Sequence, residues 1–89
     1  MEVSEVQLNV NEGVCRPSAR VVSPVKVVSV DIAIVDETSG GIASPGVLVS
    51  GSATDGVWQL PFDFKLSELS VHAEIVAFGV DGSRAEGKA

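Results

Sequence analysis

The chain has 89 residues, which is room for one domain built around one hydrophobic core. Its net charge is −6, with six Lys and Arg against twelve Asp and Glu, so nucleic acid and an anionic membrane surface are both unfavourable partners. No apolar run approaches the ~20 residues that cross a bilayer. The single cysteine, Cys15, cannot form an internal disulfide and is expected to be a small packing residue or a neutral surface thiol, not a redox or catalytic group.

The first 24 residues give a weak structural pattern. Polar and apolar residues alternate over Glu5–Val10, which predicts a half-buried strand. From Val14 to Ser23 we expect an edge strand or a loop, because Pro17 and Pro24 cannot donate hydrogen bonds to a sheet. Residues 1–24 are therefore interpreted as an N-terminal arm or as added edge strands, and residues 25–89 as a β-sandwich.

The segment Val25–Val35 carries a strong strand signal. Its even-numbered apolar residues are predicted to line one face: Val28, Val30, Ile32 and Ile34. The run Asp36–Gly41 is then predicted as a loop, and Pro45-Gly46 as the turn before the next strand.

The segment from Val47 to Phe64 predicts a hairpin. One strand spans Val47–Ala53, Asp55-Gly56 is expected to form a tight turn with Gly at positive φ, and the second strand spans Val57–Phe64. Gly51 indicates a bulge or a close backbone approach, and Pro61 an edge position or a break in the ladder. The large residues of the second strand are predicted to share one face and form a wall of the core: Trp58, Leu60, Phe62 and Phe64.

The last part of the chain predicts a long strand over Val71–Val80, after a crossing loop at Leu66–Leu69. One face is predicted to hold small and β-branched residues: Val71, Ala73, Ile75 and Ala77. The other face holds His72, Glu74, Val76, Phe78 and Val80. A turn at Asp81–Ser83 leads to Arg84–Ala89, which is predicted to be a short edge strand or a frayed tail.

From Val47 onward the sequence resembles the bacterial immunoglobulin-like modules found in surface and phage proteins. The resemblance lies in these residues: Gly51-Ser52-Ala53, Asp55-Gly56, Trp58-Gln59-Leu60, Val71-His72-Ala73, Ala77 and Asp81-Gly82. It implies an all-β fold, an immunoglobulin-like antiparallel β-sandwich of six to seven strands. The chain departs from those modules at Leu69, where they usually carry a Tyr, and it contains no Tyr at all.

The sequence offers few residues that could carry out catalysis. His72 is the only histidine and Cys15 the only cysteine, and the motifs of nucleophile elbows and phosphate loops are missing from the sequence. His72 alternates with Val71 and Ala73, so we expect it to face solvent or an interface. We predict that the chain is not an enzyme and has no cofactor.

Calcium is the most serious ligand hypothesis. Several carboxylates fall at or near predicted turns, where they can converge with backbone carbonyls: Asp36, Glu37, Asp55, Asp63 and Asp81. Their spacing does not match an EF-hand loop, and Asp is common in turns for conformational reasons, so no metal site is predicted. Because the aromatic residues are expected in the core, no small-molecule or glycan site is predicted from them either.

The strand Val71–Val80 becomes apolar on both faces toward its end. A two-layer sandwich leaves one face of each sheet in water, so Val76, Phe78 and Val80 are candidate interface residues. Three explanations remain open: the N-terminal arm covers this face, a partner subunit covers it, or the exposure is scattered and has no role.

These observations predict a non-catalytic structural or assembly module that binds a protein partner or self-assembles. The start of the chain lacks a secretory signal, while the resemblance implies a surface or virion module. A phage virion accessory subunit, such as a head decoration or tail-associated protein, satisfies both conditions. The alternative is an adhesion or glycan-binding module of a bacterial surface or secreted protein, which would bind through a loop such as Asp36–Ala43.

Overall fold

The computed structural model describes residues 1–36, 40–65 and 71–89, and in these ranges it contains strands and turns but no helix. The protein is all-β, and every strand pairing is antiparallel. Sheet I consists of β1 (Glu2–Gln7), β4 (Ser18–Val22), β8 (Asp55–Gln59) and β7 (Val47–Gly51), in that order. Sheet II consists of β11 (Arg84–Lys88), β10 (Val71–Gly79), β5 (Val27–Asp36) and β6 (Gly40–Pro45), in that order. The small sheet III consists of β2 (Val10–Asn11), β3 (Val14–Cys15) and β9 (Phe64–Lys65).

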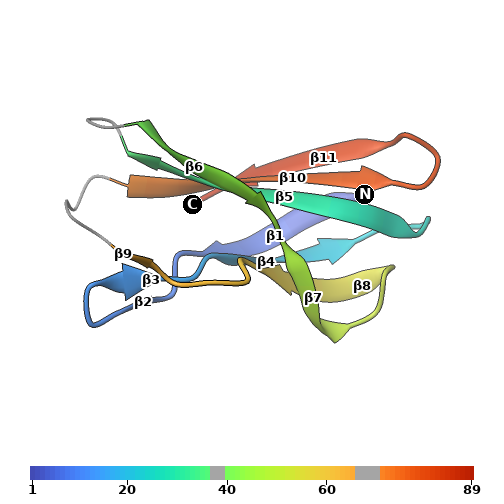
Figure 1. Ribbon diagram of the computed structural model, residues 1–89. Helices are drawn as coiled ribbons and strands as arrows, with labels where there is room; N and C mark the ends of the chain where they lie inside the picture. Colours follow the sequence, from blue (N-terminus) through green and yellow to red (C-terminus); the bar gives the residue numbers. More distant parts are fainter. Residues whose placement is uncertain (37–39, 66–70) are drawn as a thin grey trace.

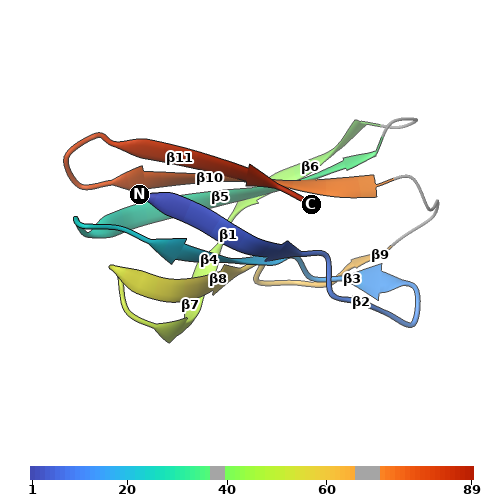
Figure 2. The ribbon, with the colours of Figure 1, turned by 180° about the vertical axis from the view of Figure 1, so that it is seen from behind.

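Sheets I and II form two layers that enclose the core, as both views of the ribbon show (Figure 1 and Figure 2). Sheet I contributes Ala19, Val21 and Trp58 to the core, all buried. Sheet II contributes the larger share: Val27, Val30, Ile32, Ile34, Ala73, Ile75 and Ala77. Cys15 from sheet III and Leu60 close one end. The fold therefore gains most of its stability from burial of these apolar side chains.

The ladder between β5 and β10 is the centre of sheet II. Ile34 lies opposite Ala73, and Val30 lies opposite Ala77, with Ile32 opposite Ile75 between them. A large residue thus lies opposite a small one on each side of the central Ile32–Ile75 pair. Alternation of large and small residues across facing positions favours close packing of the layer. The prediction that Ala73, Ile75 and Ala77 share the buried face is confirmed.

The prediction that Val14–Ser23 is an edge strand or loop is wrong. β4 lies in the interior of sheet I, between β1 and β8. The two prolines flank this strand instead of interrupting it, because β4 starts after Pro17 and ends before Pro24. Pro17 even extends the pairing, since its carbonyl accepts a hydrogen bond from the N–H of Leu60 at 2.9 Å. Residues 1–24 therefore supply an edge strand, β1, and an interior strand, β4.

The hairpin of β7 and β8 exists, but the predicted turn at Asp55-Gly56 is wrong. Both residues belong to β8, and the positive φ belongs to Gly51, at 79°. The N–H of Ser52 donates to the carbonyl of Asp55 at 2.9 Å, so the turn runs from Gly51 to Asp55. The expectation of a close backbone approach at Gly51 is confirmed, because a Cβ there would lie 2.3 Å from the Asp55 carbonyl oxygen.

The wall of aromatic residues is shorter than predicted. β8 ends at Gln59, and the chain bends around Pro61, so the predicted break in the ladder is confirmed. Phe62 is 40% exposed, which corrects its assignment to the core. Phe64 resumes as β9, pairs with Cys15 and packs against the core cluster from sheet III.

The predicted loop Asp36–Gly41 is wrong at both ends within the described residues, because Asp36 ends β5 and Gly40 and Gly41 begin β6, which pairs with β5. β6 continues into β7 through Gly46 alone, so one stretch of chain passes from sheet II to sheet I (Figure 1). The crossing is tight: the N–H of Gly46 donates to the Val30 carbonyl at 2.7 Å, and a Cβ at Gly46 would lie 2.8 Å from Ile32 Cδ1. The predicted edge strand near the C-terminus is confirmed as β11. The loop predicted at Leu66–Leu69 lies outside the described residues.

Candidate functional site

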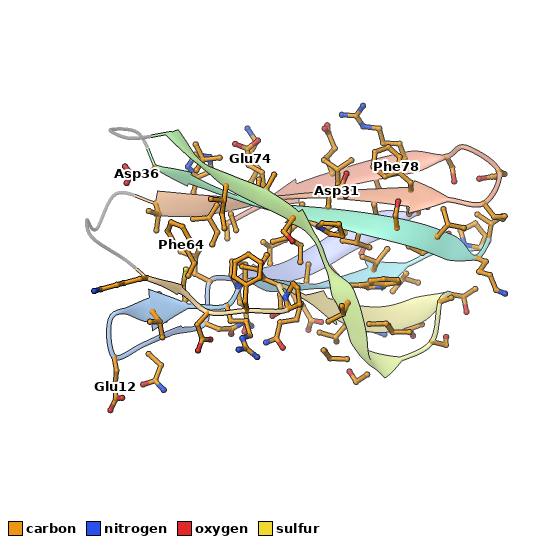
Figure 3. The ribbon with its side chains drawn as sticks, in the orientation of Figure 1. Glu12, Asp31, Asp36, Phe64, Glu74 and Phe78 are labelled. Carbon is orange, nitrogen blue, oxygen red and sulfur yellow. The ribbon has the colours of Figure 1, made fainter. Side chains whose placement is uncertain are left out.

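The predicted interface residues lie at one end of β10. Val76 and Phe78 lie on the face of sheet II that points away from sheet I, since their neighbours Ala77 and Gly79 are buried. Figure 3 shows Phe78 and Glu74 on this outer side of the sheet. Val80 follows the strand and is 64% exposed.

A bulge adds one residue that the sequence pattern had placed in the core. Phe78 pairs with Ser29, but the next residue, Gly79, pairs with Val27, so Val28 is an extra residue in β5. Val28 is 55% exposed, which corrects its assignment to the buried face of that strand. The backbone holds Val80 close by, because its N–H donates to the Lys26 carbonyl at 2.8 Å.

These four residues, Val28, Val76, Phe78 and Val80, are called the β10 patch below. Val28 and Val80 are exposed, whereas Val76 and Phe78 are half-buried. The glycine that starts the turn after the patch leaves no room for a side chain, since a Cβ at Gly79 would lie 2.4 Å from Ser83 Oγ. Gly79 lies between Phe78 and Val80, so the turn that it starts contains the last residue of the patch.

The N-terminal segment does not cover the β10 patch. β1 pairs with β4 in sheet I, and its apolar residues reach the inner side of β11. A Cβ at Gly87 would lie 2.7 Å from Val3 Cγ1 and 3.1 Å from Val6 Cγ2, and Gly87 is opposite the buried Ile75. The hypothesis that residues 1–24 fold over the outer face of β10 is therefore wrong.

Charged side chains of both signs surround the β10 patch. Arg84 is the cross-strand neighbour of Phe78, and Val76 lies between Glu86 on β11 and Asp31 on β5. Farther along the same face, Glu74 lies opposite Lys88. Two side-chain contacts form within this surface: an ion pair between Arg84 and Glu86, and a hydrogen bond of 2.9 Å between His72 Nε2 and the Glu74 carboxylate. An apolar centre with a mixed polar rim is the usual anatomy of a protein interface.

The carboxylates of the calcium hypothesis lie apart and have other partners. Asp55 is bound to Arg20, Asp63 to Arg16 at 3.0 Å, and Asp81 accepts hydrogen bonds from Ser83. The hydroxyl and N–H of Ser83 hold the pKa of Asp81 below its ordinary value. Asp36 is buried at the end of β5. Within the described residues there is no cluster of three or more His, Cys, Asp or Glu with the geometry of a metal site, and Glu37 lies outside them.

His72 and Cys15 lie in different places. His72 is half-buried on the outer face of β10, in agreement with the expectation that it faces solvent or an interface. Cys15 is fully buried in the core, as expected for a packing residue. Its burial, and next the negative charge of Asp63, raise the pKa of the Cys15 thiol. The thiol is thus kept in its protonated, less reactive form.

Only part of the alternative binding loop, Asp36–Ala43, can be described. Gly40–Ala43 belongs to β6 and pairs with β5, while residues 37–39 lie outside the described ranges. The segment is therefore partly a regular sheet edge, and not a continuous loop.

A second apolar surface went unnoticed in the sequence. Val47, Leu48 and Val49 of β7 are 44%, 40% and 51% exposed. The signal that would have found it is charge: no Asp, Glu, Lys or Arg occurs between residues 38 and 54, although the chain holds 18 of them elsewhere. A strand in such a stretch has no charged side chain to protect its edge.

Comparison with protein-family models, with curated proteins and with solved structures finds no match to this chain. In the described ranges there is also no helix with the length and apolar character needed to span a bilayer.

Proposed function

We propose that the fold is an immunoglobulin-like sandwich, because of the order of its strands. Immunoglobulin constant-type domains place strands A, B, E and D in one sheet and C, F and G in the other. Naming β1, β4, β5, β7, β8, β10 and β11 from A to G gives A-B-E-D for sheet I. Sheet II becomes G-F-C, with β6 as an added edge strand. This order supports the proposal independently of the sequence resemblance, which covers only the part from Val47 onward.

The chain departs from antibody domains in its core. Those domains carry a disulfide between strands B and F, a Trp on strand C and a tyrosine corner. Here the only cysteine precedes β4, the only Trp lies on β8, and the sequence has no Tyr. The proposal therefore concerns the strand order and not the core residues. In this chain, aliphatic residues such as Ile32, Ile34 and Ile75 fill the core.

We propose that the protein is a non-catalytic structural subunit that assembles with other copies through the β10 patch. The β10 patch itself is the observation that supports this function, since the outer face of a sandwich sheet is expected to be polar. A second copy is a suitable partner because the rim has both signs of charge. A two-fold rotation can bring Arg84 or Lys88 of one copy near Glu86 or Asp31 of another.

The setting we propose is a phage particle, where the protein would be a head decoration or tail-associated subunit. The support is the resemblance of the second half of the chain to modules of surface and phage proteins. Proteins of one fold serve many different functions, so the resemblance alone does not define the setting. The proposed role in a phage particle therefore depends on whether the protein assembles with other copies.

The test is the solution mass of the protein, measured by light scattering over a wide range of concentration. We expect a defined oligomer that the double substitution Val28→Ser and Val80→Ser weakens, because both side chains are exposed and their loss costs the monomer little. Val10→Ser is the matched control, since Val10 is 58% exposed but lies on sheet III. Equal effects of the control and the double substitution would contradict the proposal, as would a monomer at all concentrations.

A further inference from the structure

The free edge of β7 is the least protected edge of the protein. All five residues of β7 are exposed, and the strand has a neighbour, β8, on one side only. Both ribbon views show β7 at the outer border of sheet I (Figure 1 and Figure 2). Because β7 is an edge strand, its outer side has unpaired N–H and C=O groups that can accept a further strand. The register with β8 shifts between Leu48 and Ser50, and this bulge is the one edge-protecting feature of the strand.

Two of the other three edge strands in the large sheets, β1 and β11, carry charged residues. β1 carries Glu2 and Glu5. Pairing β11 with itself in full would place Glu86 opposite Glu86 and Arg84 opposite Lys88, which brings like charges together. Neither edge is therefore suited to a second copy of the same chain.

β6 is also uncharged, but its composition opposes strand addition. It begins with Gly40 and Gly41 and ends with Pro45, which has no N–H to donate. β7 instead carries three strand-forming apolar residues in a row, Val47, Leu48 and Val49.

Charge also favours a second copy as the occupant of the β7 edge. Two molecules of net charge −6 repel each other overall, and the repulsion is smallest where the contact surface is neutral or where opposite charges pair across it. β7 has no charge, and the single carboxylate of the adjacent strand, Asp55, is paired with Arg20 through two hydrogen bonds. The β7 edge is thus a place where identical acidic molecules can approach without opposing charges.

We infer that two copies of the protein pair through β7, antiparallel and related by a two-fold axis. Pairing the whole strand places Val47 opposite Gly51 and centres the contact on Val49. The two copies of sheet I then form one continuous sheet across the dimer. This contact is separate from the β10 patch, which lies on the outer face of sheet II, and it does not depend on the proposed function.

The test combines light scattering with hydrogen exchange on the complete protein. The substitution Val49→Lys adds like charges at the centre of the contact and should raise the dimer dissociation constant by about tenfold or more. Val10→Lys is the matched control, because Val10 is similarly exposed and lies on another edge strand; it should leave the dissociation constant unchanged. In the wild-type protein, the amides of residues 47–51 should exchange more slowly as the protein concentration rises.

Three results would overturn the inference. One is a dimer that Val49→Lys and Val10→Lys affect equally. Another is exchange at residues 47–51 that does not depend on concentration. The third is a protein that stays monomeric over the whole range. A dimer that only the double substitution Val28→Ser and Val80→Ser dissolves would support the β10 patch and reject the β7 contact, so the two proposals can fail separately.

Discussion

Arg20 on β4 binds Asp55 on the neighbouring strand β8 through two hydrogen bonds, from Nε to Oδ1 at 2.9 Å and from Nη2 to Oδ2 at 3.0 Å. This two-point contact is geometrically specific, because two of the three guanidinium nitrogens donate to the two carboxylate oxygens. It fixes the start of β8 next to the turn from Gly51 to Asp55. The hydrogen bonds from Arg20 hold the pKa of Asp55 below its ordinary value.

The first prediction concerns acid stability. The pKa of Asp55 is lower in the folded protein than in the unfolded chain, whose Asp groups titrate near pH ~3.9. The ion pair therefore stabilises the fold above that pH, and its contribution is lost as the pH falls through the folded pKa. In Asp55→Asn, the free energy of unfolding should fall less steeply below about pH 4 than in the wild type. Urea unfolding at a series of pH values measures this.

The substitution Arg20→Gln is the control for that experiment, because it removes the cause of the shift and keeps the carboxylate. In Arg20→Gln, the free energy of unfolding should also fall less steeply with pH below about pH 4, to a similar degree. The double variant should differ little from either single variant. The prediction would be contradicted if neither substitution changed how the free energy of unfolding depends on pH in this range.

The second prediction concerns the two-residue connection between β2 and β3. Glu12 has φ of 51° and Gly13 has φ of 78°, the pattern of a type I′ turn, in which both central residues need positive φ. Glu tolerates this conformation poorly, whereas Asn adopts it readily. The substitution Glu12→Asn should raise the free energy of unfolding by about 0.5–1 kcal/mol. Chemical denaturation would show the gain, and Glu86→Asn, on a regular strand, should show none.

The third prediction separates the two reasons for which glycine is required. Gly56 has an ordinary φ but no space, since a Cβ would lie 2.5 Å from the Ser52 carbonyl oxygen and 2.5 Å from Leu48 Cδ1. Gly82 has open space but φ of 85°. We expect Gly56→Ala to cost about 1–3 kcal/mol, because backbone must move, and Gly82→Ala to cost less. Equal costs in thermal or chemical unfolding would disagree with the position of Gly56 inside β8.

The fourth prediction concerns Cys15. Burial raises the pKa of its thiol, so in the native protein it should react with a thiol reagent only when the core opens. The labelling rate should be lower than in the denatured chain by a factor on the order of 10³ or more. Because the chain has no other cysteine, the rate reports this site alone. Rapid labelling of the native protein would show that sheet III opens separately from the core.

The sequence predicts the fold best where side chains alternate over a long run. β5 and β10 were found nearly to the residue, because Ile32, Ile34, Ala73 and Ile75 follow a period of two without interruption. The sequence does not predict the interior position of β4 or the existence of β6, because prolines and glycines, which usually mark turns, lie at the ends of these strands. Only the pairing with neighbouring strands, a tertiary effect, decides that these segments are extended.

Local backbone geometry explains the remaining errors. The turn after β7 uses Gly51 and the hydroxyl of Ser52, which accepts from the N–H groups of Thr54 and Asp55 at 3.3 Å each. The sequence therefore contains two candidate turns close together, one from Gly51 to Asp55 and one centred on Asp55-Gly56. The sequence alone does not show which of them forms. In the β10 patch, the outward positions of Val76 and Phe78 followed from alternation. The exposure of Val28 depends on a bulge, which shifts the period of the strand and is invisible in the pattern.

The passage of the chain through Gly46 has a consequence for how the protein unfolds. Because β6 and β7 are joined by this one residue, a single extended stretch of chain belongs to both layers, and we expect the two layers to come apart together. Loss of β6 from its ladder pulls on the hydrogen bond between Gly46 and Val30 and on the start of β7. Denaturation should therefore be a single cooperative transition. The free energy of unfolding from Trp58 fluorescence, which reports on sheet I, should equal the free energy of opening from amide exchange in sheet II.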